Sequence, residues 1–265
     1  MNIFWRELRF YSKGLVFWCL GMVILIWTSM IKYSTFSAAG QSMTELLAQF
    51  PKTIQTIFGM TGFDLSKVSG FYGVMFMYLA LMATIHAAML GSGIIAKEER
   101  DRTSEFIFVK PVTRGKVITA KIMAGILSML VFNIVTLLSS IFFIYVYSHD
   151  VSFVGDIVNL MLGLLCLQMI FFFVGTTTAA ISRRPKLSAS IASAILLFAF
   201  ILTYLINFNS DFDLLKYLTP FKYFDAKDIL GSGHLDWAYL AITFGLISTM
   251  VVVTYTTYTA RDLDV

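Results

Sequence analysis

Six long apolar runs constrain the fold of this chain more than any other feature. Each is about as long as a helix that crosses the ~30 Å hydrocarbon layer of a bilayer. They cover Gly14–Ile31, Gly70–Ala96, Ile122–Tyr147, Ile157–Ile181, Leu187–Asn207 and Trp237–Tyr258. Hydrophobic residues make up 58% of the 265 residues and charged residues 14%, whereas about a quarter of a soluble domain is charged. The sequence therefore predicts an all-α integral membrane protein with six transmembrane helices in one domain, residues 1–265.

The basic residues predict the orientation of these helices. If the N-terminus is cytoplasmic, 14 of the 20 Lys and Arg residues fall in cytoplasmic segments. Cytoplasmic loops of membrane proteins carry an excess of these residues, so we expect both termini on the cytoplasmic side of the membrane. The bases stand in short groups beside the spans, which does not indicate a nucleic-acid-binding surface.

Residues 1–13 have the pattern of a basic amphipathic helix at the membrane surface. Apolar residues recur at helical spacing from Phe4 to Leu15, and the bases Arg6, Arg9 and Lys13 lie on the opposite side. The same bases could simply fix the orientation of the first span. The following apolar run is longer than that of a signal peptide, so we expect it to be a retained span.

Two segments between spans, residues 32–69 and 208–236, are too long for plain turns. In the first, Pro51 should end one amphipathic helix, and Ile54 and Phe58 belong to a second. The second contains Pro220-Phe221 and an acidic group at Asp225 and Asp228. Apolar pieces too short to span predict interfacial or re-entrant helices on the outer side.

The most informative segment is 97–121, between spans two and three. It holds seven of the chain's basic residues. Glu98 and Arg102 are favourably oriented i, i+4 partners on a helix, and the apolar residues 106–109 precede the helix-ending Pro111. This pattern predicts a short amphipathic cytoplasmic helix with a charged face for a partner. On charge alone, an ordinary basic loop that sets topology explains the segment as well.

The order of residues in this segment resembles the signature loop of type-2 ABC transporter permeases, a family of bacterial drug, antibiotic-peptide and polysaccharide exporters. That loop has a Glu, then Gly-Thr-x-Glu, apolar residues, Pro-Val-Ser/Thr-Arg, and a Lys that opens the next span. The matching positions here are Glu99, Thr103, Glu105, Pro111, Val112, Thr113, Arg114 and Lys121. The sequence departs from the pattern at Arg102, where the family usually has Gly.

The resemblance implies a permease subunit that moves an amphipathic, peptide-like, drug-like or lipid-like substrate across the bacterial membrane. It implies two ABC ATPase subunits, which would bind ATP and Mg²⁺, and a second permease, identical or paralogous. The ATPase-coupling residues would be Glu98, Glu99, Thr103, Glu105, Phe106, Pro111, Thr113, Arg114 and Lys121, and the N-terminal interface would use Arg6, Arg9 and Lys13. The chain contains no G-x-x-x-x-G-K-[ST] run, so we expect no ATP hydrolysis and no cofactor in this chain.

Polar residues inside the spans are candidates for a substrate path: His86, Asn133 and Gln168. Such residues more often hydrogen-bond between helices as part of the packing. The sequence shows no metal-ligand spacing and no catalytic grouping. A non-transporting sensor or immunity protein is an alternative function. An ion-coupled transporter is disfavoured because the spans hold no carboxylate well inside them.

Overall fold

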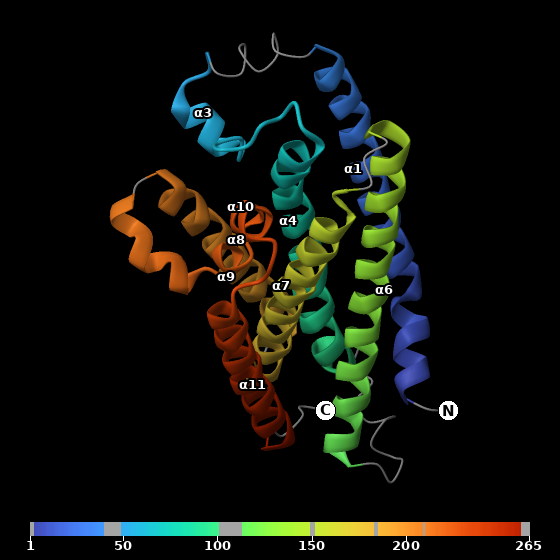
Figure 1. The fold of residues 1–265 in the computed structure, drawn as a ribbon. Coiled ribbons are helices and arrows are strands. Elements are labelled where there is room, and N and C mark those ends of the chain that lie inside the picture. Colours follow the sequence, from blue (N-terminus) through green and yellow to red (C-terminus); the bar gives the residue numbers. More distant parts are fainter. Residues whose placement is uncertain are drawn as a thin grey trace.

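The computed structural model describes residues 3–39, 49–100, 113–148, 152–182, 185–208 and 210–260, and these ranges are mostly helical with no strand (Figure 1). The long helices are α1 (Ile3–Ala39), α4 (Val68–Arg100), α6 (Arg114–Ser148), α7 (Val154–Ile181), α8 (Pro185–Phe208) and α11 (Trp237–Ala260). Each contains a stretch long and apolar enough to cross a membrane. The predicted fold of six transmembrane helices is confirmed.

Several helices extend beyond the predicted spans. Because α4 continues to Arg100 and α6 begins at Arg114, both ends of segment 97–121 belong to span helices. The predicted helix before Pro111 lies outside the described residues. Residues 3–13 are helical, but they run into the first span without a break, because α1 is one helix. They are therefore its first turns and not a separate surface helix.

The helices α4 and α7 form the centre of the bundle. They are the most buried of the six, and α1 and α11 are the most exposed. Glycines let the two central backbones approach closely: a Cβ on Gly91 would lie 2.2 Å from the Phe172 carbonyl oxygen, and one on Gly175 would lie 2.5 Å from that of Ala88. Small residues at such crossings are typical of membrane helices. The helices α1 and α6 pack side by side along one flank (Figure 1).

Four short helices lie toward the opposite end of the bundle from the α1 start. They are α3 (Lys52–Ile57), the 3₁₀ helix η1 (Ser210–Leu218), α9 (Pro220–Tyr223) and α10 (Ala226–Ser232). Local chemistry sets their ends. Pro220 occupies the first turn of α9, where its missing N–H costs nothing, and the Asp225 carboxylate accepts from the Lys227 amide to cap α10. These helices confirm that segments 32–69 and 208–236 both contain short helical pieces.

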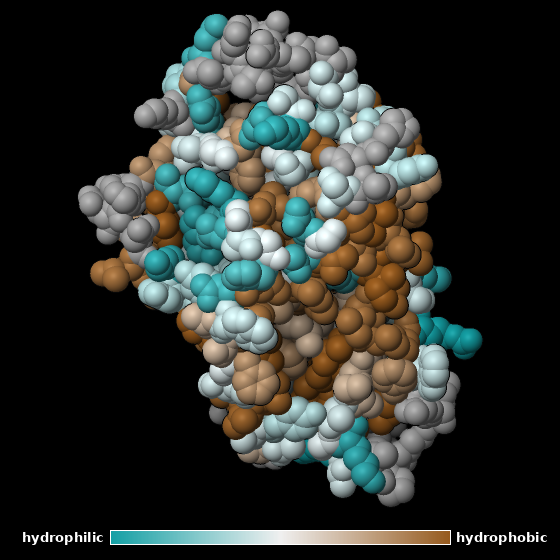
Figure 2. Space-filling view, in the orientation of Figure 1, coloured by the Kyte–Doolittle hydropathy of each residue, from teal (hydrophilic) through white to brown (hydrophobic). Residues whose placement is uncertain are grey.

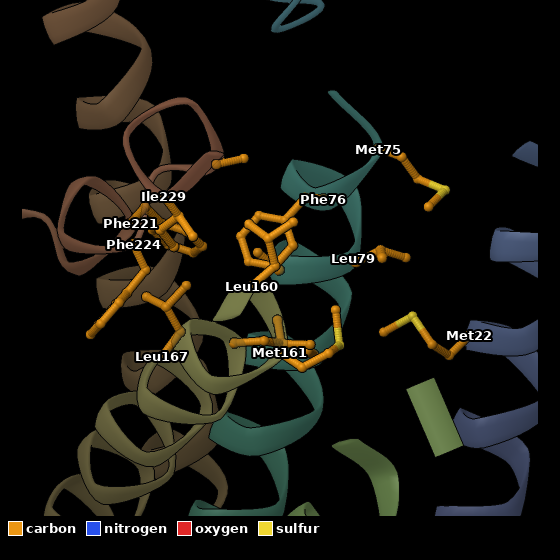
Figure 3. Close-up of a cluster of buried hydrophobic side chains, with 14 of the residues drawn as sticks. Met22, Met75, Phe76, Leu79, Leu160, Met161, Leu167, Phe221, Phe224 and Ile229 are labelled. Carbon is orange, nitrogen blue, oxygen red and sulfur yellow. The ribbon is translucent and has the colours of Figure 1, made fainter. Parts of the chain in front are cut away.

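The short helices are held by aromatic and aliphatic side chains that enter the core. Phe221 and Phe224 point from α9 and its C-terminal end toward Leu167 of α7, and Ile229 of α10 lies beside them (Figure 3).

The exterior differs between regions. Figure 2 shows a broad hydrophobic surface over α6 and α7 and a hydrophilic patch over α9 and α10. The apolar surface suits contact with lipid.

Candidate functional site

Three span helices meet through charged side chains at one end of the bundle. The start of α1, the end of α4 and the start of α6 lie together there (Figure 1). The last turn of α11 joins them, because the Arg114 guanidinium donates to the Thr259 carbonyl oxygen at 3.4 Å. We call this region the charged end. It flanks the segment that the sequence singles out as the partner-binding loop.

Two buried ion pairs connect the helices at the charged end. The Lys97 ammonium of α4 donates to Glu7 Oε2 of α1 at 2.7 Å. The Lys121 ammonium of α6 donates to Glu98 Oε2 of α4 at 2.5 Å and to the Ile94 carbonyl oxygen at 2.5 Å. The first pair therefore ties α1 to α4, and the second ties α4 to α6.

Arg6 joins the two pairs into one network. Its Nη2 donates to Glu7 Oε1 at 2.9 Å and to Glu98 Oε1 at 3.3 Å. Each carboxylate thus accepts from Arg6 through one oxygen and from a lysine through the other. The Lys97 ammonium also lies 4.0 Å from the centre of the Phe10 ring, an attractive cation–π geometry.

Burial makes this network sensitive to the loss of any member. Glu7 and Lys121 are both 0% exposed, and Lys97 and Glu98 are also buried. A charge withdrawn from water is tolerated when it is paired and its hydrogen bonds are satisfied. Removing one member of such a pair costs about 3–5 kcal/mol, because it leaves the other charge buried and unpaired. Loss of any one of the interactions that join these helix ends is therefore expected to destabilise the protein strongly.

The structure brings together Arg6, Glu98 and Lys121 from the predicted site residues. Arg9 and Lys13 are exposed on α1, Thr113 is exposed before α6, and Glu99 and Arg114 are half-buried. Glu98 and Lys121 are buried, and their ion pair joins α4 to α6. Thr103, Glu105, Phe106 and Pro111 lie outside the described residues.

Two members of the network, Glu7 and Lys97, were missed as site residues. The sequence could have identified Glu7, because it is the first acidic residue of the chain and the next is Glu45. It also follows Phe4 by three residues, which puts it on the apolar face of the helix. An acid on the buried side of a basic segment indicates a buried ion pair. The sequence could not identify Lys97 as its partner among seven nearby bases.

The polar residues inside the spans pack against neighbouring helices. The His86 ring of α4 stacks on Phe132 of α6 with ring centres 4.9 Å apart, and it lies 5.5 Å from the ring of Trp18 in α1. Asn133 of α6 donates to the Met161 carbonyl oxygen of α7 at 3.1 Å and to Gln168 Oε1 at 3.4 Å. All three predicted residues are buried. Their contacts join helices, as the packing interpretation expects.

Among the described residues, no group of three or more His, Cys, Asp or Glu side chains could hold a metal ion. The polar contacts at the charged end are ion pairs and hydrogen bonds between helices. Its arrangement is suited to holding three helix ends in register.

Comparison with known proteins identifies the family. A comparison with curated proteins found no match. A comparison with protein families matches residues 1–263 to the family described as ABC-2 family transporter protein. A match of that extent includes all six span helices and the charged end, and this chain therefore belongs to the ABC-2 family of transporter proteins, as a multi-pass membrane protein.

Proposed function

We propose that this chain is the permease subunit of an ATP-driven exporter in a bacterial plasma membrane. Two ABC ATPase subunits would bind ATP and Mg²⁺ and dock on segment 97–121, and a second permease would complete the pathway. The substrate would be amphipathic and peptide-like, drug-like or lipid-like. The observation that carries this proposal is the charged end, where the two helices that flank the docking segment are joined to each other and to α1.

The network would convert a local push into movement of several helices. A force on the segment between Arg100 and Arg114 reaches the end of α4 and the start of α6 together. The Lys121–Glu98 pair keeps those two ends in register, and the Lys97–Glu7 pair includes α1. Interfaces of this kind shift between discrete arrangements and do not deform gradually. The three helices would therefore change position as one unit when the ATPases close.

Two groups of residues would have different roles in coupling. Glu99 and Arg114 are half-buried and Thr113 is exposed, so these residues could contact the ATPase directly. Glu98 and Lys121 would act as positioning residues, because they are buried and pair with each other. Loss of the first group should weaken docking, and loss of the second should weaken transmission of the movement.

The test separates docking from transmission in the purified complex. The permease is co-purified with its ATPase and reconstituted in liposomes, as wild type, as the triple variant Glu99→Ala, Glu105→Ala, Arg114→Ala, and as Lys121→Met. The triple variant should lose the ATPase. Lys121→Met should retain it but lose most of the ATP-dependent transport. Lys32→Ala, an exposed lysine at the opposite end of α1, is the control.

Different outcomes would contradict different parts of the proposal. Retention of both the ATPase and transport in the triple variant would refute docking on this segment. An ATPase that never associates with a well-folded wild type, together with peptide binding by the chain alone, would favour the sensor or immunity function. Normal transport by a folded Lys121→Met variant would refute the positioning role.

A further inference from the structure

A cavity lies between α4, α7, α8 and the short helices, away from the charged end. Its volume is about 190 Å³. Its walls come from the segment after α3, from α4 and α8, and from α9 and the start of α10. These parts are distant in sequence, so the cavity depends on the folded outer segments. The charged end contributes nothing to it.

The interior of this cavity is aromatic and aliphatic. Phe76 of α4, Leu167 of α7 and Phe221 and Phe224 of the α9 region line it, and Figure 3 shows these side chains gathered on one side of α4. The Phe200 and Phe221 rings meet edge to face with centres 5.4 Å apart. Such walls suit an alkyl chain or an aromatic ring, since they offer area for apolar burial.

Hydroxyl, amide and charged groups also line the cavity, and those of Thr61, Asn207 and Lys227 are exposed at its rim. Thr56, Thr61 and Asn207 line it together with Lys222, Asp225 and Lys227. The charge of Lys222 is compensated, because its ammonium lies 2.7 Å from Asp225 Oδ2. The hydrophilic patch over α9 and α10 in Figure 2 belongs to this part of the surface. A ligand that fills the apolar interior would therefore have its other end among polar groups.

Lys227 supplies a second positive charge at this rim, and Asp228 attracts it only at longer range. Lys227 is exposed, and no carboxylate among the described residues lies within 4.0 Å of its ammonium. The ammonium lies over the backbone of Gly62, where an added Cβ would be 2.8 Å from Nζ. Gly62 has φ +86°, a conformation that favours glycine. The turn at Gly62 thus leaves room for the lysine beside the opening.

We propose that this cavity binds one apolar chain or ring whose polar end is an anion, held by Lys227. The apolar walls select the body of the ligand, and Lys227, which has no carboxylate within 4.0 Å among the described residues, selects the sign of its head. The volume is below the roughly 300–1,000 Å³ of sites for whole drug-sized molecules. The cavity accordingly takes one short chain or the end of a longer one. The inference is independent of the proposed ATPase partner, because the chain alone supplies every group.

The test uses a ten-carbon fatty acid that carries a photoactivatable diazirine, and the matching alcohol as its neutral counterpart. The purified chain is placed in nanodiscs of zwitterionic phosphatidylcholine, and competition by the unlabelled compounds gives apparent Kd values. Labelled positions are mapped by mass spectrometry. The variants are Lys227→Gln, which removes the cation, and Thr61→Trp, which fills the opening from an exposed position. Lys32→Gln is the matched control, because it removes an exposed lysine elsewhere.

We expect labelling of α8 and α9 peptides in the wild type and loss of that labelling in Thr61→Trp. Lys227→Gln should weaken binding of the acid by about fivefold at low salt and leave binding of the alcohol unchanged. Lys32→Gln should bind both compounds like the wild type. Equal binding of acid and alcohol to the wild type, or labelling that Thr61→Trp does not reduce, would overturn the proposal.

A second arm distinguishes the two sources of such an anion. Nanodiscs that contain phosphatidylglycerol are compared with those of phosphatidylcholine alone. If phosphatidylglycerol displaces the fatty acid from wild type but not from Lys227→Gln, the occupant is a chain of an anionic membrane lipid. If it does not displace the fatty acid, while the Lys227-dependent preference for the acid persists, the occupant is a free anionic amphipath.

Discussion

The pair between Glu7 and Lys97 gives the sharpest test of the charged end. The atoms are 2.7 Å apart, and the side chains are 0% and 10% exposed. Glu7→Leu leaves the Lys97 ammonium buried beside the Phe10 and Tyr11 rings without its carboxylate, and Lys97→Met leaves Glu7 with Arg6 and, at longer range, Lys121. Each single change should lower the free energy of unfolding by about 3–5 kcal/mol. That is a large part of the ~5–15 kcal/mol that keeps a domain folded.

The double variant Glu7→Leu, Lys97→Met should lose far less free energy of unfolding than the two single variants lose together. Two apolar side chains of similar size leave no unpaired charge at this position, and such replacements are often neutral. The assay is unfolding by SDS in mixed micelles, followed through the fluorescence of the chain's four tryptophans. The exposed pair Lys67–Asp64, with side chains 74% and 46% exposed, is the control and should show almost no coupling. If the Glu7 and Lys97 losses add to within about 0.5 kcal/mol, the two sites are energetically independent and the reasoning is refuted.

Three further predictions use the same unfolding assay. Gly91→Ala should destabilise the protein by about 1–3 kcal/mol through overpacking, because its Cβ would overlap a backbone oxygen. Gly14→Ala is the control: there is open space at that position, so the change should be neutral or slightly stabilising. Asn133→Leu should cost about 1 kcal/mol by removing a hydrogen bond between helices while transport is retained; loss of transport at full stability would instead support a substrate path. Gly62→Ala should cost about 1 kcal/mol because its φ is +86°; an unchanged stability would show that this turn relaxes freely.

The six spans could be predicted because hydropathy is a local property of the sequence. The apolar runs located the six span helices of the described residues, and Pro51 directly precedes the short helix α3. The helix predicted before Pro51 lies largely outside the described residues. The ends of the helices could not be found in this way. Beyond the hydrocarbon, α1 and α4 persist as helices that carry charged residues, and their pairing joins residues 90 positions apart. A window of apolar residues contains no information about that contact.

Only part of the candidate site could be predicted, because the sequence gives residue types and not the contacts between helices. The sequence named Glu98 and Lys121 as partner-coupling residues, which stays a prediction, and it did not indicate that they form a buried ion pair with each other. The sequence also identified Asn133 and Gln168 as polar residues within spans. Their hydrogen bond to each other depends on the relative rotation of α6 and α7, which is set by packing of the whole bundle.

The length of α1 separates Glu7 from the apolar run of the first span. Glu7 precedes the apolar run at Gly14 by about two turns, which corresponds to ~10 Å along the helix axis. A shift of α1 by one full turn covers only ~5.4 Å. A slide of α1 toward the membrane by one turn would therefore keep the Glu7 carboxylate short of the place where the apolar run began. For Glu7, the electrostatic cost of such a movement would arise from its pairing with Arg6 and Lys97.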